Sequence, residues 1–187
     1  MQRAWSVDGG KLELVVGDVT AQETDAIANA ANAMLMGGGG VDGAIHRAAG
    51  PELLDALRAL KRSLPGGVLH TGGAVITPGF HLKAKHVIHC VGPIYEREGD
   101  EAPALLASCY REALRLAREH ALASITFPSI STGVYGYPVG RAASIALEAV
   151  VSELREHRKP GLVRFALFDA GVFDAYASAA SALLPEG

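Results

Sequence analysis

Four consecutive glycines, Gly37–Gly40, are the feature that most constrains how this 187-residue chain can fold. Because glycine has no Cβ, such a run can adopt positive φ angles and bring backbone N–H groups close to a ligand. The run also loses much conformational entropy on folding, a loss that close approach to an anion would offset. Asn29 and Asn32 precede the run, and Asp42 follows it just before a helical pattern. The segment therefore predicts a loop that binds an anion at the N-terminus of a helix.

Composition and charge favour one globular domain and exclude some partners. The chain is 49% hydrophobic and 20% charged, which is enough apolar material for one core. We expect a single domain over residues 1–187, with its core from about residue 11 to residue 183. The net charge of −3 shows no basic excess, so no surface specific for nucleic acid is expected.

The cysteines and the N-terminal segment indicate the compartment. Cys90 and Cys109 lie in apolar stretches, which favours buried free thiols in a reducing compartment, with a disulfide between them as the alternative. Met1–Gly10 has no apolar leader pattern, and no apolar stretch is long enough to cross a bilayer. We therefore expect a cytoplasmic protein without membrane contact. No exposed apolar stripe stands out, so a monomer is expected.

Strand and helix patterns alternate along the chain. Strand patterns cover Lys11–Val16, Asp25–Ala31, Ala74–Thr77, His86–Val91, Ser124–Ile130 and Leu162–Phe168. Helical patterns cover Gly43–Leu60 with a break at Gly50-Pro51, then Pro103–His120, Gly140–His157 and Phe173–Leu183. Thr20–Glu23 has the spacing of a capping box and predicts a short helix or turn. This order predicts an α/β fold, a three-layer α/β/α sandwich with a mixed central sheet.

Three loops follow strands where such a fold binds its ligands. Gly17–Thr20, Asn32–Asp42 and Ser131–Pro138 all lie beyond the carboxyl ends of predicted strands. Neither glycine-rich loop ends in the Gly-Lys-Ser/Thr of a Walker loop, and neither matches the Rossmann fingerprint. The pattern therefore predicts a nucleotide diphosphate held by backbone N–H groups, with no Mg²⁺ and no other cofactor.

Five motifs in order resemble the macrodomain family, in its MacroD-type branch. They are Gly17-Asp18-Val19-Thr20, Asn29-Ala30-Ala31-Asn32, Met36–His46, Val87–Pro93 and Ser129–Pro138, within a resemblance that spans Lys11 to Tyr176. Members of this branch bind ADP-ribose and hydrolyse its esters, including O-acetyl-ADP-ribose and ADP-ribose linked to Asp or Glu of proteins. The resemblance implies an ester hydrolase whose partners are ADP-ribose and ADP-ribosylated proteins. A non-catalytic ADP-ribose reader is the alternative.

The resemblance also implies roles for individual positions. Asp18 would accept a hydrogen bond from the adenine amino group, with the Val19 backbone beside it, and Phe168 would lie against the adenine face. Asn32 would bind the distal ribose, and Asp42 would activate the water that attacks the ester. The diphosphate would contact Gly40, Val41, Ser131, Thr132, Gly133, Val134 and Tyr135, the last also lying against the distal ribose. Asp169–Asp174 departs from the acidic, amide-rich sequence common in the branch, so the adenine-side contacts carry over less directly.

Structural interpretations remain open for several of these side chains. Asp42 could be the N-cap of the following helix, and Asp18 could form a turn. Asn29 is better explained by hydrogen bonds to buried backbone groups, and Thr20 by a cap. His46 lies one helical turn after Asp42 and could orient it, although a structural helix histidine is favoured.

Two further histidines, His86 and His89, fall in or near a predicted buried strand. Neither has cysteine or carboxylate partners at the spacing of a metal site. The sequence therefore predicts no metal ligands.

Overall fold

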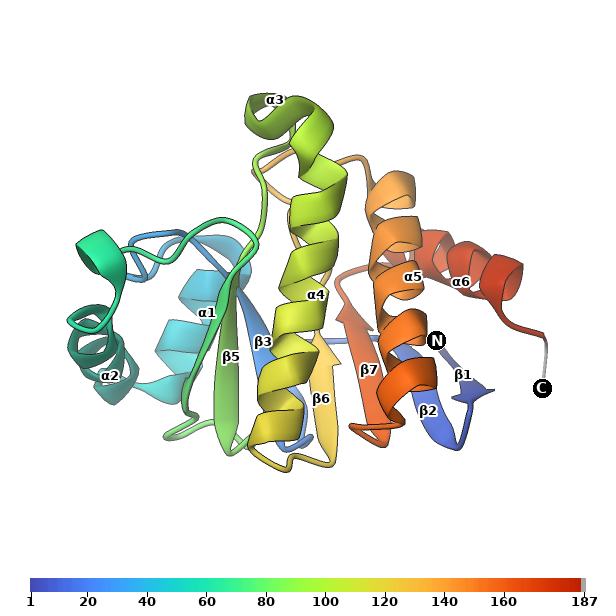
Figure 1. Ribbon diagram of the computed structural model, residues 1–187. Helices are drawn as coiled ribbons and strands as arrows, with labels where there is room; N and C mark the ends of the chain where they lie inside the picture. The colour runs from blue at the N-terminus through green and yellow to red at the C-terminus, as the bar shows by residue number, and fades with distance from the viewer. Residues whose placement is uncertain (186–187) are drawn as a thin grey trace.

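A seven-stranded mixed sheet forms the centre of the computed structural model, which describes residues 1–185 (Figure 1). The strands are β1 (Gln2–Val7), β2 (Gly10–Val16), β3 (Ala26–Ala31), β4 (Ala74–Pro78), β5 (His86–Val91), β6 (Ser124–Phe127) and β7 (Leu162–Leu167). Their order is β1-β2-β7-β6-β3-β5-β4, in which the inner strands are parallel and the edge strands β1 and β4 are antiparallel.

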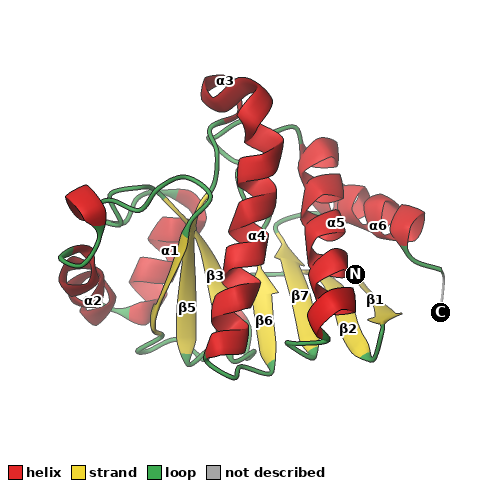
Figure 2. Cartoon of the chain, viewed as in Figure 1, coloured by secondary structure: helices red, strands yellow, loops and turns green. Residues whose placement is uncertain are grey.

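Helices cover both faces of this sheet (Figure 2). α1 (Gly40–Ala49) and α2 (Glu52–Lys61) bury their apolar side chains in one core. α4 (Ala102–Glu119), α5 (Val139–His157) and α6 (Ala170–Leu183) pack in a second, larger core. The short α3 (Tyr95–Glu98) and three 3₁₀ turns at Val19–Ala21, Pro65–Gly67 and Gly99–Glu101 lie in the connections. The predicted three-layer α/β/α sandwich with a mixed sheet is confirmed.

The main omission of the sequence analysis is β1. This strand pairs with β2 through a tight turn in which both Asp8 and Gly9 have positive φ. Asp-Gly is a strong signal for a two-residue hairpin. However, only Trp5 and Val7 are buried along the strand, so the apolar alternation is too short to stand out.

Element boundaries shift by a few residues, mostly where glycines or caps decide them. α1 begins three residues before the predicted start at Gly43, and α6 begins at Ala170 rather than Phe173. The break at Gly50-Pro51 separates α1 from α2 as expected. The short helix or turn predicted at Thr20–Glu23 is present as a 3₁₀ turn at Val19–Ala21, but the predicted capping box is wrong because Asp18 supplies the cap.

An aromatic cluster in the larger core holds the beginning of the third predicted loop. Tyr110 and Phe165 pack around Phe127, with ring centroids 5.0 and 5.6 Å from it. The Tyr110 hydroxyl accepts a hydrogen bond from the Ile130 N–H (3.2 Å), and the Tyr176 hydroxyl lies 2.8 Å from the Ser129 hydroxyl. The core therefore fixes the backbone just before Ser131.

Cys90 and Cys109 are both free and buried, as predicted, and the alternative disulfide is not formed. Burial raises the pKa of the Cys109 thiol to about 12 and the pKa of Cys90 well above its usual value. Both thiols therefore stay protonated and behave as small apolar side chains.

None of the helices within residues 1–185 combines the length and apolar character needed to span a bilayer.

Candidate functional site

The three predicted ligand loops meet at one edge of the sheet. Strands β2, β7, β6, β3 and β5 run parallel, so their carboxyl ends share that edge. The loops that begin at Gly17, Asn32 and Ser131 leave β2, β3 and β6 there. This is where open α/β sheets bind their ligands.

The glycine run forms the entry to α1. Gly37 and Gly40 have positive φ (84° and 58°), and Gly39 is the N-cap without any side-chain hydrogen bond to the helix. The first N–H groups of α1 therefore have no side-chain cap and point to the carboxyl edge. A Cβ at Gly38 would lie 3.3 Å from Asp42 Oδ2 and 3.5 Å from Asn32 Nδ2. The two side chains thus converge on the backbone of Gly38.

Asp42 lies in the first turn of α1 and is only 5% exposed. Its Oδ1 accepts a hydrogen bond from Asn29 Nδ2 (2.8 Å) and lies 3.4 Å from His46 Nε2. Because Gly39 is the N-cap, the interpretation of Asp42 as a helix cap is wrong. His46 Nε2 lies beside the carboxylate without a hydrogen bond to it, so both the structural interpretation of His46 and the orienting one remain predictions. Asn29 therefore holds the carboxylate through Oδ1, and Oδ2 is directed at the glycine loop.

Asn29 and Asn32 have different hydrogen-bond partners. Asn32 Nδ2 donates to the Gly37 carbonyl (3.0 Å), and its buried Oδ1 has no partner among the described residues. Asn29 is fully buried in β3 and bonds side chains, not the buried backbone groups that the sequence analysis favoured. An unfilled buried acceptor on Asn32 is suited to a hydroxyl donor from a ligand.

The third loop follows β6 and turns back on itself. Ser131 has a positive φ of 68°, and its carbonyl accepts from the Tyr137 N–H at 2.9 Å. Thr132 Oγ1 bonds back to Ser129, and the Tyr135 carbonyl accepts from the Tyr95 N–H at 2.9 Å. Gly133 and Val134 at the tip are exposed. The loop is therefore anchored at both ends, and its tip is open to a ligand.

The loops after β2 and β7 lie side by side, because Gly17 donates to the Leu167 carbonyl at 2.9 Å. Asp18 follows one strand, and the 91% exposed Phe168 follows the other. Asp18 Oδ1 accepts from both the N–H and the hydroxyl of Thr20, each at 2.8 Å. Thr20 is thus the capped residue and not the cap, and the turn-forming role of Asp18 is confirmed.

The backbone that carries Asp18 is tied to the sheet. Gln22 Nε2 donates to the Asp18 carbonyl (3.1 Å), and Gln22 Oε1 accepts from Arg164 (3.1 Å). Arg164 is paired with the buried Glu13 at 2.7 Å. Burial alone would raise the pKa of Glu13, but hydrogen bonds from Lys11 and Arg164 lower it overall. Glu13 therefore remains a carboxylate that holds Arg164 in place.

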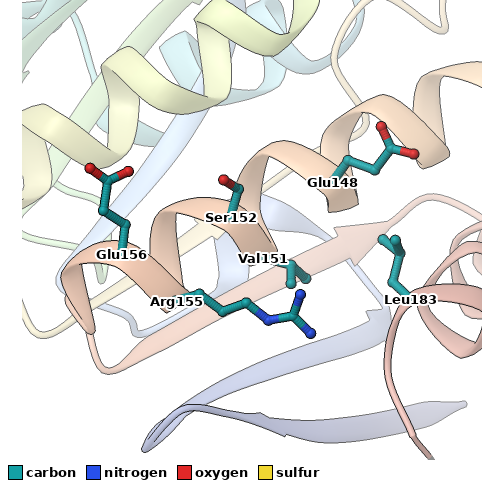
Figure 3. Close-up of a pocket in the computed structure, with 6 residues that line it drawn as sticks. All are labelled: Glu148, Val151, Ser152, Arg155, Glu156 and Leu183. Carbon is teal, nitrogen blue, oxygen red and sulfur yellow. The ribbon is translucent and has the colours of Figure 1, made fainter.

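A hollow between α5 and α6 lies apart from this edge (Figure 3). It is lined by Glu148, Val151, Ser152, Arg155, Glu156 and Leu183. None of these residues comes from the three loops, and the polar ones are exposed side chains along α5. Nearby, Glu153 and Glu156 approach His157 at metal-ligand spacing, but Arg118 lies 2.9 Å from Glu153 and already balances its charge. The chemistry of the molecule therefore centres on the carboxyl edge.

Comparisons with known proteins agree with this geometry. The sequence profile described as Macro domain matches residues 28–146. A macro domain-containing protein of Streptomyces griseus is 51% identical over 162 residues, 87% of this chain and 90% of the relative. An O-acetyl-ADP-ribose deacetylase of Cronobacter sakazakii is 48% identical over 167 residues, 89% of this chain and 92% of that relative. Among solved structures, a variant of the Oceanobacillus iheyensis macrodomain with ADPR has a TM-score of 0.95 and 47% identity, covering 98% of both chains.

Proposed function

The chain belongs to the macrodomain family, and from that premise we propose that it binds ADP-ribose and hydrolyses its esters. The substrates are O-acetyl-ADP-ribose and ADP-ribose attached to Asp or Glu side chains of proteins. The observation that carries this proposal is the position of Asp42. Its buried carboxylate faces the glycine loop beside the unfilled Oδ1 of Asn32.

The diphosphate occupies the space between the two glycine-containing loops. Gly40 and Val41 supply N–H groups from the start of α1, where the helix dipole also favours negative charge. Ser131, Thr132, Gly133, Val134 and Tyr135 supply the backbone of the opposite wall. These dipoles are already in place, so they stabilise charge without reorganising during the reaction.

Different side chains bind the adenine and the distal ribose, the two ends of the ligand. At one end, Asp18 accepts from the adenine amino group beside the Val19 backbone, and Phe168 lies against the base. At the other end, Asn32 accepts a hydrogen bond from the distal ribose. Tyr135 lies against that ribose.

Asp42 acts on the water that cleaves the ester. The carboxylate takes a proton from the water as the water attacks, and the products are ADP-ribose and a free carboxylic acid. Positioned general-base catalysis of this kind contributes about 10²–10⁴ in rate. Asn29 holds the carboxylate by a hydrogen bond to Oδ1, with His46 beside the same oxygen, so the second oxygen is left to meet the water.

The direct test is the release of free ADP-ribose from a protein that carries ADP-ribose on glutamate, together with the cleavage of O-acetyl-ADP-ribose. We expect turnover of both substrates by the unmodified chain. In heavy-oxygen water, the label appears in the released carboxylate if the carbonyl is attacked and in ADP-ribose if the anomeric carbon is attacked. Tight binding of ADP-ribose without any turnover would make the protein a reader and overturn the proposed hydrolysis.

Replacing Asp18 should change how the base is recognised. We expect Asp18→Asn to weaken ADP-ribose binding roughly tenfold, since a hydrogen bond to a charged group is worth about 1.5 kcal/mol or more. The Asn oxygen can still accept from Thr20, which keeps the 3₁₀ turn, while its amide presents a donor to the base. Titration calorimetry with ADP-ribose and with inosine diphosphate ribose measures the effect.

Inosine diphosphate ribose is the matched ligand, because hypoxanthine carries a carbonyl acceptor where adenine has its amino donor. The Asp18→Asn variant should therefore lose affinity for the adenine ligand and gain relative affinity for the inosine ligand. An equal change for both ligands would mean that Asp18 shapes the loop and does not contact the base.

A further inference from the structure

A line of polar side chains crosses the apolar core beneath α1 and ends at Asp42. Asn29 on β3, His89 on β5 and Thr77 on β4 lie in neighbouring strands and are at most 4% exposed. The same core contains Ile27 and Val87, both fully buried. Polar groups in such surroundings are costly unless each donor meets an acceptor. The side-chain polar atoms of these three residues all have partners except Asn29 Oδ1, which is buried without one among the described residues.

The contacts form a continuous path. Asn29 Nδ2 lies 2.8 Å from Asp42 Oδ1 and 3.1 Å from His89 Nδ1. His89 Nε2 lies 2.9 Å from Thr77 Oγ1, and Thr77 Oγ1 donates to the Pro78 carbonyl at 3.1 Å. Each link is within hydrogen-bond distance, from the edge strand β4 to the carboxylate on α1.

The acceptors at the two ends of the path, the Asp42 carboxylate and the Pro78 carbonyl, set the direction of the bonds between them. The Pro78 carbonyl can only accept, so the Thr77 proton points to it and the Thr77 oxygen accepts from His89 Nε2–H. Burial, with a smaller contribution from His46, lowers the pKa of His89 to about 3, so the ring is neutral and carries one proton. His89 Nδ1 is then an acceptor, and Asn29 must turn its amide nitrogen toward both His89 and Asp42.

We propose that Thr77 and His89 are positioning residues for Asp42: they set the histidine tautomer, and the tautomer sets the orientation of the Asn29 amide. This inference rests on the proposed hydrolase function. Without the Thr77 hydroxyl, the His89 ring can carry its proton on Nδ1, and Asn29 then turns its oxygen toward that proton. The amide oxygen meets Asp42 Oδ1 in place of the donor, and the carboxylate is displaced from the glycine loop.

Thr77→Val tests the proposal because valine has nearly the same shape and lacks the hydroxyl. We expect kcat on O-acetyl-ADP-ribose to fall about tenfold, a part of the 10²–10⁴ that a positioned general base contributes. KM and the Kd for ADP-ribose should stay within about twofold, since backbone groups hold the diphosphate. Thr77→Ser restores the hydroxyl and should recover most of kcat. A Thr77→Val enzyme with unchanged kcat would overturn the proposal.

Thr126→Val is the matched control for the loss of a buried hydroxyl. Thr126 is fully buried on β6, and its hydroxyl pairs with Thr24 Oγ1 at 2.7 Å, away from Asp42. This variant should lose stability as Thr77→Val does and keep its kcat. If both variants lose kcat equally, Thr77 acts through general stability and the proposal is wrong.

NMR separates this proposal from the proposed function. The ¹⁵N resonances of the His89 ring, assigned by their absence in His89→Gln, should show the Nε2–H tautomer in the parent and a change in Thr77→Val. The Asp42 ¹³Cγ resonance should move in Thr77→Val and not in Thr77→Ser or Thr126→Val. These spectra need no turnover, so a parent protein that hydrolyses nothing overturns only the hydrolase function. Two results would overturn the positioning role of Thr77 and His89. One is an Nδ1–H tautomer of His89 in the parent, and the other is an Asp42 ¹³Cγ resonance that does not move in Thr77→Val.

Discussion

Asp42→Ala is expected to lower the turnover of ADP-ribosyl esters by about 10²–10⁴ while ADP-ribose binds nearly as tightly as to the parent protein. The reason is that binding and catalysis use different groups. In the proposed complex, the diphosphate is held by backbone N–H groups whose positions depend on Gly37–Gly40 and on the loop after β6. In the same proposal, Asp42 activates the attacking water, and we expect that removing its carboxylate leaves the N–H groups where they are.

The structure also limits the damage that this substitution does to folding. Asn29 loses one acceptor, but its amide nitrogen keeps His89 Nδ1 at 3.1 Å. The measurements are kcat and KM on O-acetyl-ADP-ribose together with the Kd of ADP-ribose by calorimetry. A parallel loss of affinity and turnover would remove the catalytic role and assign Asp42 to the binding of the ligand.

Glu153→Gln provides the matched control, because Glu153 is another buried carboxylate on a helix. It lies on α5 and pairs with Arg118 at 2.9 Å, remote from the three loops. Its substitution should cost some stability, since the half-buried Arg118 loses a charged partner, and should leave kcat unchanged. Comparing Asp42→Ala with Glu153→Gln separates a loss of kcat caused by the position of the Asp42 carboxylate from one caused by removing the charge of any buried acid.

The sequence was sufficient for the layered fold because long periodic segments decide it. Every strand from β2 to β7 and each of the helices α1, α2, α4, α5 and α6 overlaps a predicted segment, with ends that differ by up to three residues. The sequence analysis did not predict β1, because its apolar alternation is short. It did not predict α3, because that helix spans only Tyr95–Glu98. Cap geometry was harder to predict, since the capping of Thr20 by Asp18 depends on a 3₁₀ turn that no periodicity indicates.

The site was predictable where it follows from motifs and unpredictable where it follows from strand pairing. The glycine loop and the side chains of Asn32 and Asp42 come from one continuous segment, so their proximity could be expected. The path through Asn29, His89 and Thr77 depends on β3, β5 and β4 being neighbours and on their register. A histidine in a buried strand, close to other polar residues in neighbouring strands, was the only signal. The sequence could not show which of these side chains share a face.

Gly43→Ala is expected to disrupt the glycine loop, which is the proposed diphosphate site. A Cβ at this position would lie 2.5 Å from the Gly38 carbonyl oxygen and 3.1 Å from Arg47 Nη1, and the first of these atoms is backbone. Because Gly43 is part of α1, the helix cannot move aside without repacking its buried face, so the loop at Gly38 must shift instead. The loop and the first turn of α1 then no longer present their N–H groups together.

The expected loss of ADP-ribose affinity is about a hundredfold or more, since each hydrogen bond to a charged group contributes about 1.5–3 kcal/mol and at least two are misaligned. Overpacking should also lower the free energy of unfolding by about 1–3 kcal/mol. Gly140→Ala is the control, because Gly140 also lies in the first turns of a helix and a Cβ there meets nothing within 4 Å. That variant should bind ADP-ribose normally and be as stable as the parent or slightly more stable. If Gly43→Ala retained the parent affinity, the glycine loop would not be the diphosphate site, and the ligand would have to be sought at the loop after β6 alone.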